Sequence, residues 1–109
     1  MKEETHKAAI PMMICYSSLF GVTVPLIEVR KNKRKWGCCI DRKKIIFAAD
    51  MCMLPPRLFE YVVAHEVCHI VVMDHSTRFW DLLGTVMPDH LQRQDELKRD
   101  TPLYRFIAD

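Results

Sequence analysis

The chain has 109 residues, of which half are apolar and 28% are charged, and its 16 Lys and Arg nearly balance its 14 Asp and Glu. This length predicts a single domain over residues 1–109 that can bury a core without disulfides or a structural metal, and the composition excludes a disordered chain. No apolar run reaches the about 20 residues of a transmembrane helix, and Glu3 and Glu4 stand where a secretory signal needs positive charge.

The first half of the chain predicts one short helix followed by strands. Residues 1–8 are polar and are expected to be frayed. Residues 11–20 are predicted as a helix that has a proline in its first turn and ends at Gly21. Three alternating segments predict the strands of an antiparallel meander, at residues 22–30, 36–40 and 45–48.

The second half changes to helical spacing. From Leu58 onward, apolar residues recur at three- and four-residue intervals and predict a helix that ends near residues 73–74. Ser76 is placed to cap a second helix over residues 77–87. Residues 90–99 are predicted as a third helix, polar and facing solvent. Strands followed by helices indicate an α+β domain.

The first of these helices carries the sequence His65-Glu66-Val67-Cys68-His69, an HExxH pattern. His65 and His69 are four residues apart, so both imidazoles leave the same helix face one turn apart and can bind one Zn²⁺. Glu66 lies near that face and can accept a proton from water that the metal activates, without itself binding the metal. Burying three titratable groups in an otherwise apolar helix without a purpose would cost on the order of several kcal/mol.

A catalytic zinc ion needs a third protein ligand and an open fourth position. His75 follows His69 just past the predicted helix end and is the predicted third ligand. This spacing is that of metzincins, but Val72 stands where those proteins have the glycine of the turn. Either the chain turns differently here, or the helix continues further. Asp74 and Asp81 are both candidates to accept a hydrogen bond from a ligand imidazole.

Several apolar residues around the pattern are predicted to belong to the core. Trp36 is expected to pack behind the metal-binding helix rather than to contact substrate. Phe79 and Trp80 are also expected in the core. Met87 is a candidate for a hydrophobic floor under the metal, by analogy with the Met-turn of metzincins, although a core methionine at a helix end is the simpler interpretation.

Together these motifs resemble the YgjP-like zinc metallopeptidases, relatives of the WLM and SprT-like proteins within the zincins. The resemblance covers about residues 28–99 and rests on Trp36, Gly37 and Cys39, on residues 61–69, on His75, Ser76, Phe79 and Trp80, and on Met87, Pro88 and Asp89. It implies a zincin-like fold in which His65, His69 and His75 bind zinc and Glu66 is the general base. The chain departs from the family pattern at Cys38, where the family has Ser, and in its short N-terminal part.

The fold predicted from all of this is α+β and zincin-like. An N-terminal helix precedes a three-stranded antiparallel sheet, and the HExxH helix is followed by two further helices. The predicted activity is hydrolysis of a peptide or protein substrate with one Zn²⁺ ion. An extended peptide is expected to add to an edge strand of the sheet.

Three other functions remain open. A small regulatory protease of the ImmA/IrrE-like kind shares the HExxH pattern, and a structural zinc domain would fill all four metal positions with ligands. A SprT-like, DNA-associated module would use the segment 30–44, which holds eight basic side chains and one acid. The residues expected to contact nucleic acid in that case are Arg30, Lys31, Lys33, Arg34 and Lys35.

The cysteines bear on the compartment. There are five, an odd number, and none belongs to a CxxC pair. Because the N-terminus also lacks the features of an export signal, the sequence predicts reduced thiols and a cytoplasmic protein.

Overall fold

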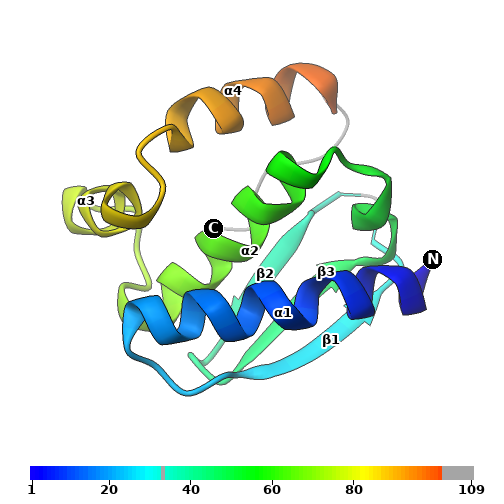
Figure 1. The fold of residues 1–109 in the computed structure, drawn as a ribbon, viewed down its shortest axis with the longest axis horizontal. Coiled ribbons are helices and arrows are strands. Elements are labelled where there is room, and N and C mark those ends of the chain that lie inside the picture. The colour runs from blue at the N-terminus through cyan, green and yellow to red at the C-terminus, as the bar shows by residue number, and fades with distance from the viewer. Residues whose placement is uncertain (33, 102–109) are drawn as a thin grey trace.

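A computed structural model describes residues 1–32 and 34–101, and it confirms the α+β class (Figure 1). Lys33, one of the predicted nucleic-acid contacts, lies outside the described residues. The elements in chain order are α1 (Lys2–Phe20), β1 (Leu26–Arg30), β2 (Gly37–Ile40), β3 (Lys44–Ala48), the short 3-10 helix η1 (Ala49–Met53), α2 (Pro56–Val71), α3 (Thr77–Val86) and α4 (His90–Asp100).

The sheet is mixed, so the prediction of an antiparallel meander was wrong. Its strand order is β1-β3-β2, with β1 parallel and β2 antiparallel to β3. The continuous apolar run of β3 explains this order, because residues 45–48 are all buried and such a strand belongs in the centre of a sheet. The connection from β1 to β2 crosses the end of β3, where the Ala48 N–H donates to the Trp36 carbonyl at 2.9 Å.

Helix α1 begins at Lys2, so residues 2–8 are helical, and the expectation that residues 1–8 are frayed was wrong. Burial of the first turns is the reason, because Thr5 and Ala9 are both completely buried. The Thr5 hydroxyl donates to the Ala49 carbonyl at 2.6 Å and accepts from the Cys52 N–H at 3.0 Å, which fixes the start of α1 on η1. The helix ends at Gly21, as predicted, with a left-handed φ of 70°.

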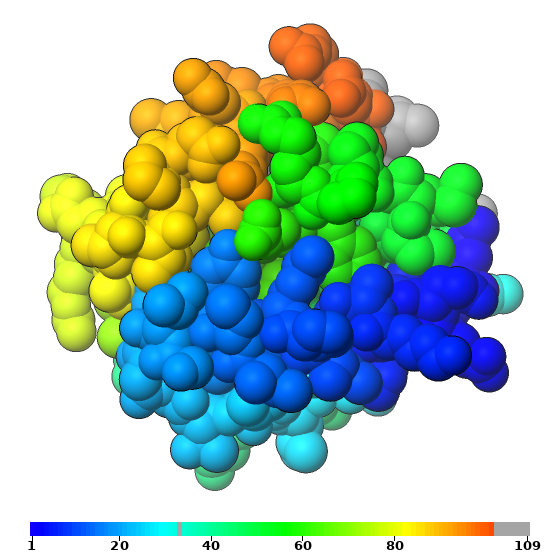
Figure 2. All heavy atoms as spheres, in the orientation of Figure 1, coloured from blue at the N-terminus to red at the C-terminus, as the bar shows by residue number. Residues whose placement is uncertain are grey.

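Helix α2 is the centre of the molecule. Figure 1 shows α1 and α2 lying across the sheet, and α1 packs on β1 while α2 packs on β2 and on α1. Helices α3 and α4 both pack on α2 from the other side. In Figure 2 the side chains of α1, in blue, and of α3 and α4, in yellow and orange, close around α2, in green. The functional pattern therefore lies on the most enclosed helix of the fold.

Helix α4 is not simply a solvent-facing helix, as the sequence had predicted. Leu97 is completely buried, and Arg93 reaches across to α2, where its Nη1 donates to the Glu60 carboxylate at 3.0 Å. Arg93 Nε also donates to Asp89 at 3.0 Å, and the Tyr16 hydroxyl of α1 donates to the second oxygen of Glu60 at 2.8 Å. Through Glu60, this network joins α1, α2 and α4.

The basic segment is divided by the fold. The connection after β1 carries Lys31, Arg34 and Lys35 at one end of the sheet, whereas the β2–β3 turn carries Arg42 and Lys43 at the other end. The four residues of β2 separate these groups by about 13 Å. In addition, Glu28 pairs with Arg30 at 2.7 Å and with Lys44 at 3.4 Å. The basic residues described in this segment are therefore divided between two ends of the sheet, and this arrangement gives no support to nucleic-acid binding.

The tight turn between β2 and β3 gives a test of local stability. Asp41 and Arg42 have φ of 52° and 58°, and the Lys43 N–H donates to the Ile40 carbonyl at 3.0 Å, which is the type I′ geometry that favours glycine at its second central position. We expect Arg42→Gly to stabilise the fold by about 1 kcal/mol, because it removes left-handed strain. This corresponds to a rise of roughly 5 °C in Tm, measured by calorimetry.

The control is Arg34→Gly. Arg34 is an exposed loop residue without positive φ, so glycine there adds only chain entropy to the unfolded state. Its Tm is expected to stay level or fall. A rise of equal size in both variants would mean that backbone strain at Arg42 is not the cause.

Candidate metal centre

Three imidazole rings meet at the C-terminal end of α2. The Nε2 atom of His75 lies 3.1 Å from Nε2 of His65 and 3.1 Å from Nε2 of His69. One ligand atom from each ring can be chosen so that all lie within 4.8 Å of one another. In a tetrahedral zinc site with Zn–N of 2.0–2.1 Å, ligand nitrogens are about 3.3 Å apart. Two of the three separations are thus close to this spacing, and the three predicted histidines are placed so that one metal ion could bind them all.

The chain turns back toward the helix without a glycine. Helix α2 ends at Val71, and Val72 adopts extended geometry with φ of −129° and ψ of 108°. Since this conformation is open to any residue, the metzincin glycine is not needed at this position. The extended exit from the helix carries His75 back over the ends of His65 and His69.

Each helical imidazole has a partner at its other ring nitrogen. Nδ1 of His65 lies 3.1 Å from the hydroxyl of Tyr61, one turn earlier on α2, and Nδ1 of His69 lies 3.0 Å from the carbonyl oxygen of Val72. When Nδ1–H donates to these oxygens, the lone pair of each ring is on Nε2, the atom that faces His75.

Asp74 and Asp81, the candidates for this orienting role, are exposed. The Asp74 carboxylate accepts a hydrogen bond from the Ser76 N–H at 3.1 Å and so shapes the loop before α3. Tyr61 and His65 are four residues apart on the predicted helix, and this spacing could have identified Tyr61 from the sequence as the partner of His65. The Val72 carbonyl was not visible, because its position depends on how the helix ends.

Phe79 forms the base of the centre. Its ring is completely buried and its centroid lies 4.8 Å from that of His65, 4.5 Å from that of His69 and 5.0 Å from that of His75. The prediction of Phe79 as a core residue is correct, but it also occupies the floor position considered for Met87. Met87 is buried at the end of α3, as the simpler interpretation had it.

The ring of Trp80 packs against the ring of His75, the predicted third ligand. Its ring stacks on His75 with centroids 5.5 Å apart and an angle of 18°, and on His90 at 5.6 Å and 14°. It also meets the ring of His65 edge-on at 5.8 Å. The loop residue His75 is therefore fixed by aromatic contacts from α3, which compensates for its place outside a helix.

The surroundings favour the neutral form of His65. Burial lowers the pKa of His65 well below its ordinary value, and the neighbouring rings of His69 and His75 lower it further. Neutral imidazole is the form that binds a metal, so this shift favours coordination through His65.

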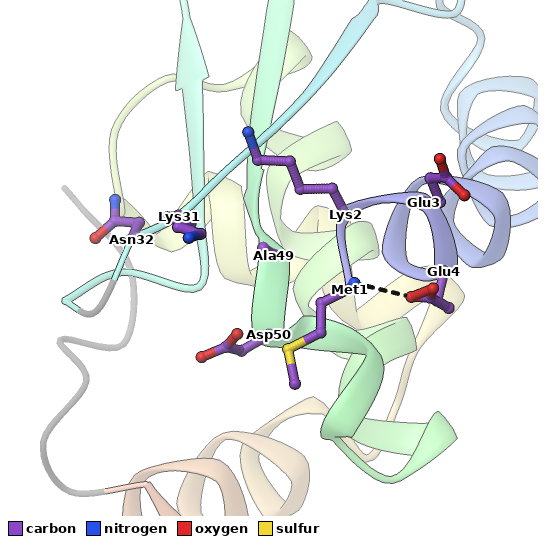
Figure 3. A pocket seen from close by; sticks show the side chains of 8 residues that line it. All are labelled: Met1, Lys2, Glu3, Glu4, Lys31, Asn32, Ala49 and Asp50. Carbon is purple, nitrogen blue, oxygen red and sulfur yellow. Dashed lines mark ion pairs between the residues drawn. The ribbon is translucent and has the colours of Figure 1, made fainter.

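A cavity of about 610 Å³ lies elsewhere, between the start of α1 and the ends of β1 and β3 (Figure 3). The three histidines are not among its lining residues, which are Met1, Lys2, Glu3, Glu4, Lys31, Asn32, Ala49 and Asp50. Both basic and acidic groups line it, and the Met1 amino group pairs with Glu4 at 3.0 Å. This mixture favours no single charge of ligand.

Comparison with known proteins identifies a family and a similar fold. The chain matches the family model of the YgjP-like metallopeptidase domain over residues 1–100. The crystal structure of the metallopeptidase zymogen of Pyrococcus abyssi abylysin has a similar fold, with a TM-score of 0.80 and 17% sequence identity, over 92% of this chain and 99% of that one.

Among curated proteins no match is found. Within residues 1–32 and 34–101, no helix has the length and apolar character needed to cross a membrane. The family match covers nearly the whole sequence and includes every residue of the metal centre. The chain belongs to the YgjP-like metallopeptidase family.

Proposed function

We propose that the chain is a minimal zinc peptidase in which His65, His69 and His75 bind one Zn²⁺ and Glu66 is the general base. The observation that carries this proposal is the pair of 3.1 Å Nε2 separations that bring three buried or half-buried imidazoles to one point. Membership of a metallopeptidase family supports a peptide or protein substrate.

The donor set fits zinc. Three neutral nitrogen ligands with a fourth position left for solvent or substrate are typical of catalytic rather than structural zinc sites. When Nδ1–H of His65 and His69 donates a hydrogen bond, the lone pair of each ring lies on Nε2, and that nitrogen can bind the metal. Imidazole also suits other divalent metals, but a rigid site of three nitrogens with no carboxylate favours zinc over magnesium or calcium.

When bound, the ion supplies Lewis acidity, which makes water a nucleophile near neutral pH and polarises a carbonyl oxygen. Glu66, next to His65 on α2, takes a proton from the attacking water on its carboxylate. It then delivers that proton to the nitrogen of the leaving amine as the peptide bond breaks. Phe79 and Trp80 hold the ring planes and keep the base of the site dry.

The mechanism predicts separate effects on metal and catalysis when Glu66 changes. Glu66→Gln removes the base but keeps the size of a buried side chain, so zinc and fold are expected to remain while hydrolysis falls by about 10²–10⁴-fold. Zinc is measured by elemental analysis and hydrolysis with casein as an unfolded substrate.

Glu60→Gln is the control, because Glu60 belongs to the network with Tyr16 and Arg93 and not to the centre. It should keep its activity. Loss of zinc in the Glu66→Gln protein would contradict the role given to Glu66. Full hydrolysis in that protein would show that Glu66 is not the general base.

Ligand removal gives a second prediction. His69→Ala deletes one of three nitrogens and is expected to abolish stoichiometric zinc binding, while His6→Ala, an exposed change on α1, should leave zinc content at one ion per chain. Elemental analysis of both purified proteins provides the measurement. Unchanged metal content after His69→Ala would show that the ligand set is wrong.

The hydroxyl group of Tyr61 gives a third prediction. Tyr61→Phe removes the oxygen that lies 3.1 Å from Nδ1 of His65 and leaves the buried ring in place. Zinc affinity is expected to fall by about 10–100-fold, measured by competition with a chromogenic chelator. Tyr16→Phe, which loses a hydroxyl bound to Glu60 instead, should keep the wild-type affinity. Equal zinc affinities in the wild type and both variants would show that the Tyr61 hydroxyl does not contribute to zinc binding.

A further inference from the structure

Gly37, the first residue of β2, lies against the side chain of Glu66. A methyl group placed on Gly37 would lie 2.9 Å from Cγ, 3.2 Å from Cδ and 3.0 Å from Oε2 of Glu66. Carbon atoms in ordinary contact are 3.5–4.0 Å apart, so there is no room for any side chain at this position. All three nearest atoms belong to the proposed general base.

The backbone conformation at position 37 does not explain why the residue there is glycine. The non-glycine and glycine residues with positive φ in the described chain are Asp41, Arg42 and Gly21, so Gly37 has a conformation that other residues adopt. Glycine also weakens the interior of a strand, because it loses more chain entropy on folding and offers no side chain to pack. Its presence in β2 therefore needs a reason in the tertiary structure, and the contact with Glu66 provides it.

Neither partner is able to move away. Gly37 pairs with Phe47 of the central strand, and the residue before it, Trp36, is held by the Ala48 N–H at its carbonyl and by its own ring N–H donating to Thr101 at 3.1 Å. Glu66 is completely buried on α2. Its nearest contact is Cγ, close to the helix backbone, so rotation of the carboxylate alone would not relieve a clash.

We infer that Gly37 is a positioning residue that sets the place of the Glu66 carboxylate. The bare backbone of β2 forms a wall against which the Glu66 side chain packs, and this wall limits where the carboxylate can lie. The catalytic consequence rests on the proposed role of Glu66 as general base, whereas the packing of Gly37 on Glu66 does not.

A stability cycle tests the packing. The four full-length proteins are the wild type, Gly37→Ala, Glu66→Ala and the double variant, each unfolded in urea without metal. Gly37→Ala alone is expected to raise the unfolding equilibrium constant by about tenfold or more, because overpacking a buried contact is destabilising. In the Glu66→Ala background the same change should cost little, because Cγ, Cδ and Oε2 are gone and the methyl group enters their space.

The cycle remains decisive if Gly37→Ala alone does not fold, since the double variant must then fold. Equal costs of Gly37→Ala in both backgrounds, or no cost in either, would overturn the inference. Gly84→Ala is the matched control, because a methyl group there meets His90 at 3.7 Å, an ordinary contact inside a helix. It should keep or raise stability in both backgrounds.

A second measurement separates positioning from general damage. Zinc-loaded Gly37→Ala is expected to bind zinc within about twofold of the wild type, because no ligand moves, while kcat on casein falls by about tenfold or more with little change in KM. Gly84→Ala should keep the wild-type kcat. A loss of zinc that matches the loss of activity would mean a structural effect only and would overturn the positioning role.

The two proposals fail differently. If the wild type binds zinc but does not hydrolyse casein or other unfolded substrates, the proposed function fails. The stability cycle still decides whether Gly37 positions Glu66. If the wild type is active but the two changes are additive in the cycle, the inference on Gly37 fails while the peptidase stands.

Discussion

The candidate metal centre depends on holding three imidazoles close together, two of them buried on α2. Rings whose Nε2 atoms are 3.1 Å apart would repel one another if they were charged. Enclosure of α2 by the sheet, α1, α3 and α4 reduces this repulsion at His65, because burial disfavours the charged form of that ring. The large core thus serves the candidate site as well as stability.

The helices were largely predictable, whereas the sheet was not. Helical spacing and the proline and glycine signals located α2, α3 and α4 to within a few residues. The strands were found as segments, but their order was not, because alternation within a segment says nothing about its neighbours. The apolar run of β3, buried on both faces, was the available signal for a central strand. The helical start of α1 was missed because Thr5 is anchored by η1, a contact distant in sequence.

At the candidate metal centre the sequence predicted the part that depends on helix geometry. The predictions of His65, Glu66 and His69 come from their spacing, and that of His75 from its place past the helix end. For residues that act through tertiary packing, the sequence did not predict the specific contact. Phe79 was predicted as core, although its contact with all three rings depends on where α3 packs. Gly37 was noted as part of a motif, but its contact with Glu66 depends on the distance between a strand and a helix.

The carboxylate of Glu60 binds Tyr16 of α1 with one oxygen and Arg93 of α4 with the other. The first and last helices of the described chain therefore share one anchor on α2, the helix that carries two of the three histidines of the candidate site. Removal of either whole helix would take away its packing on α2 together with one donor to this half-buried carboxylate. Helices α1 and α4 thus support α2 jointly, and part of that support passes through a single side chain.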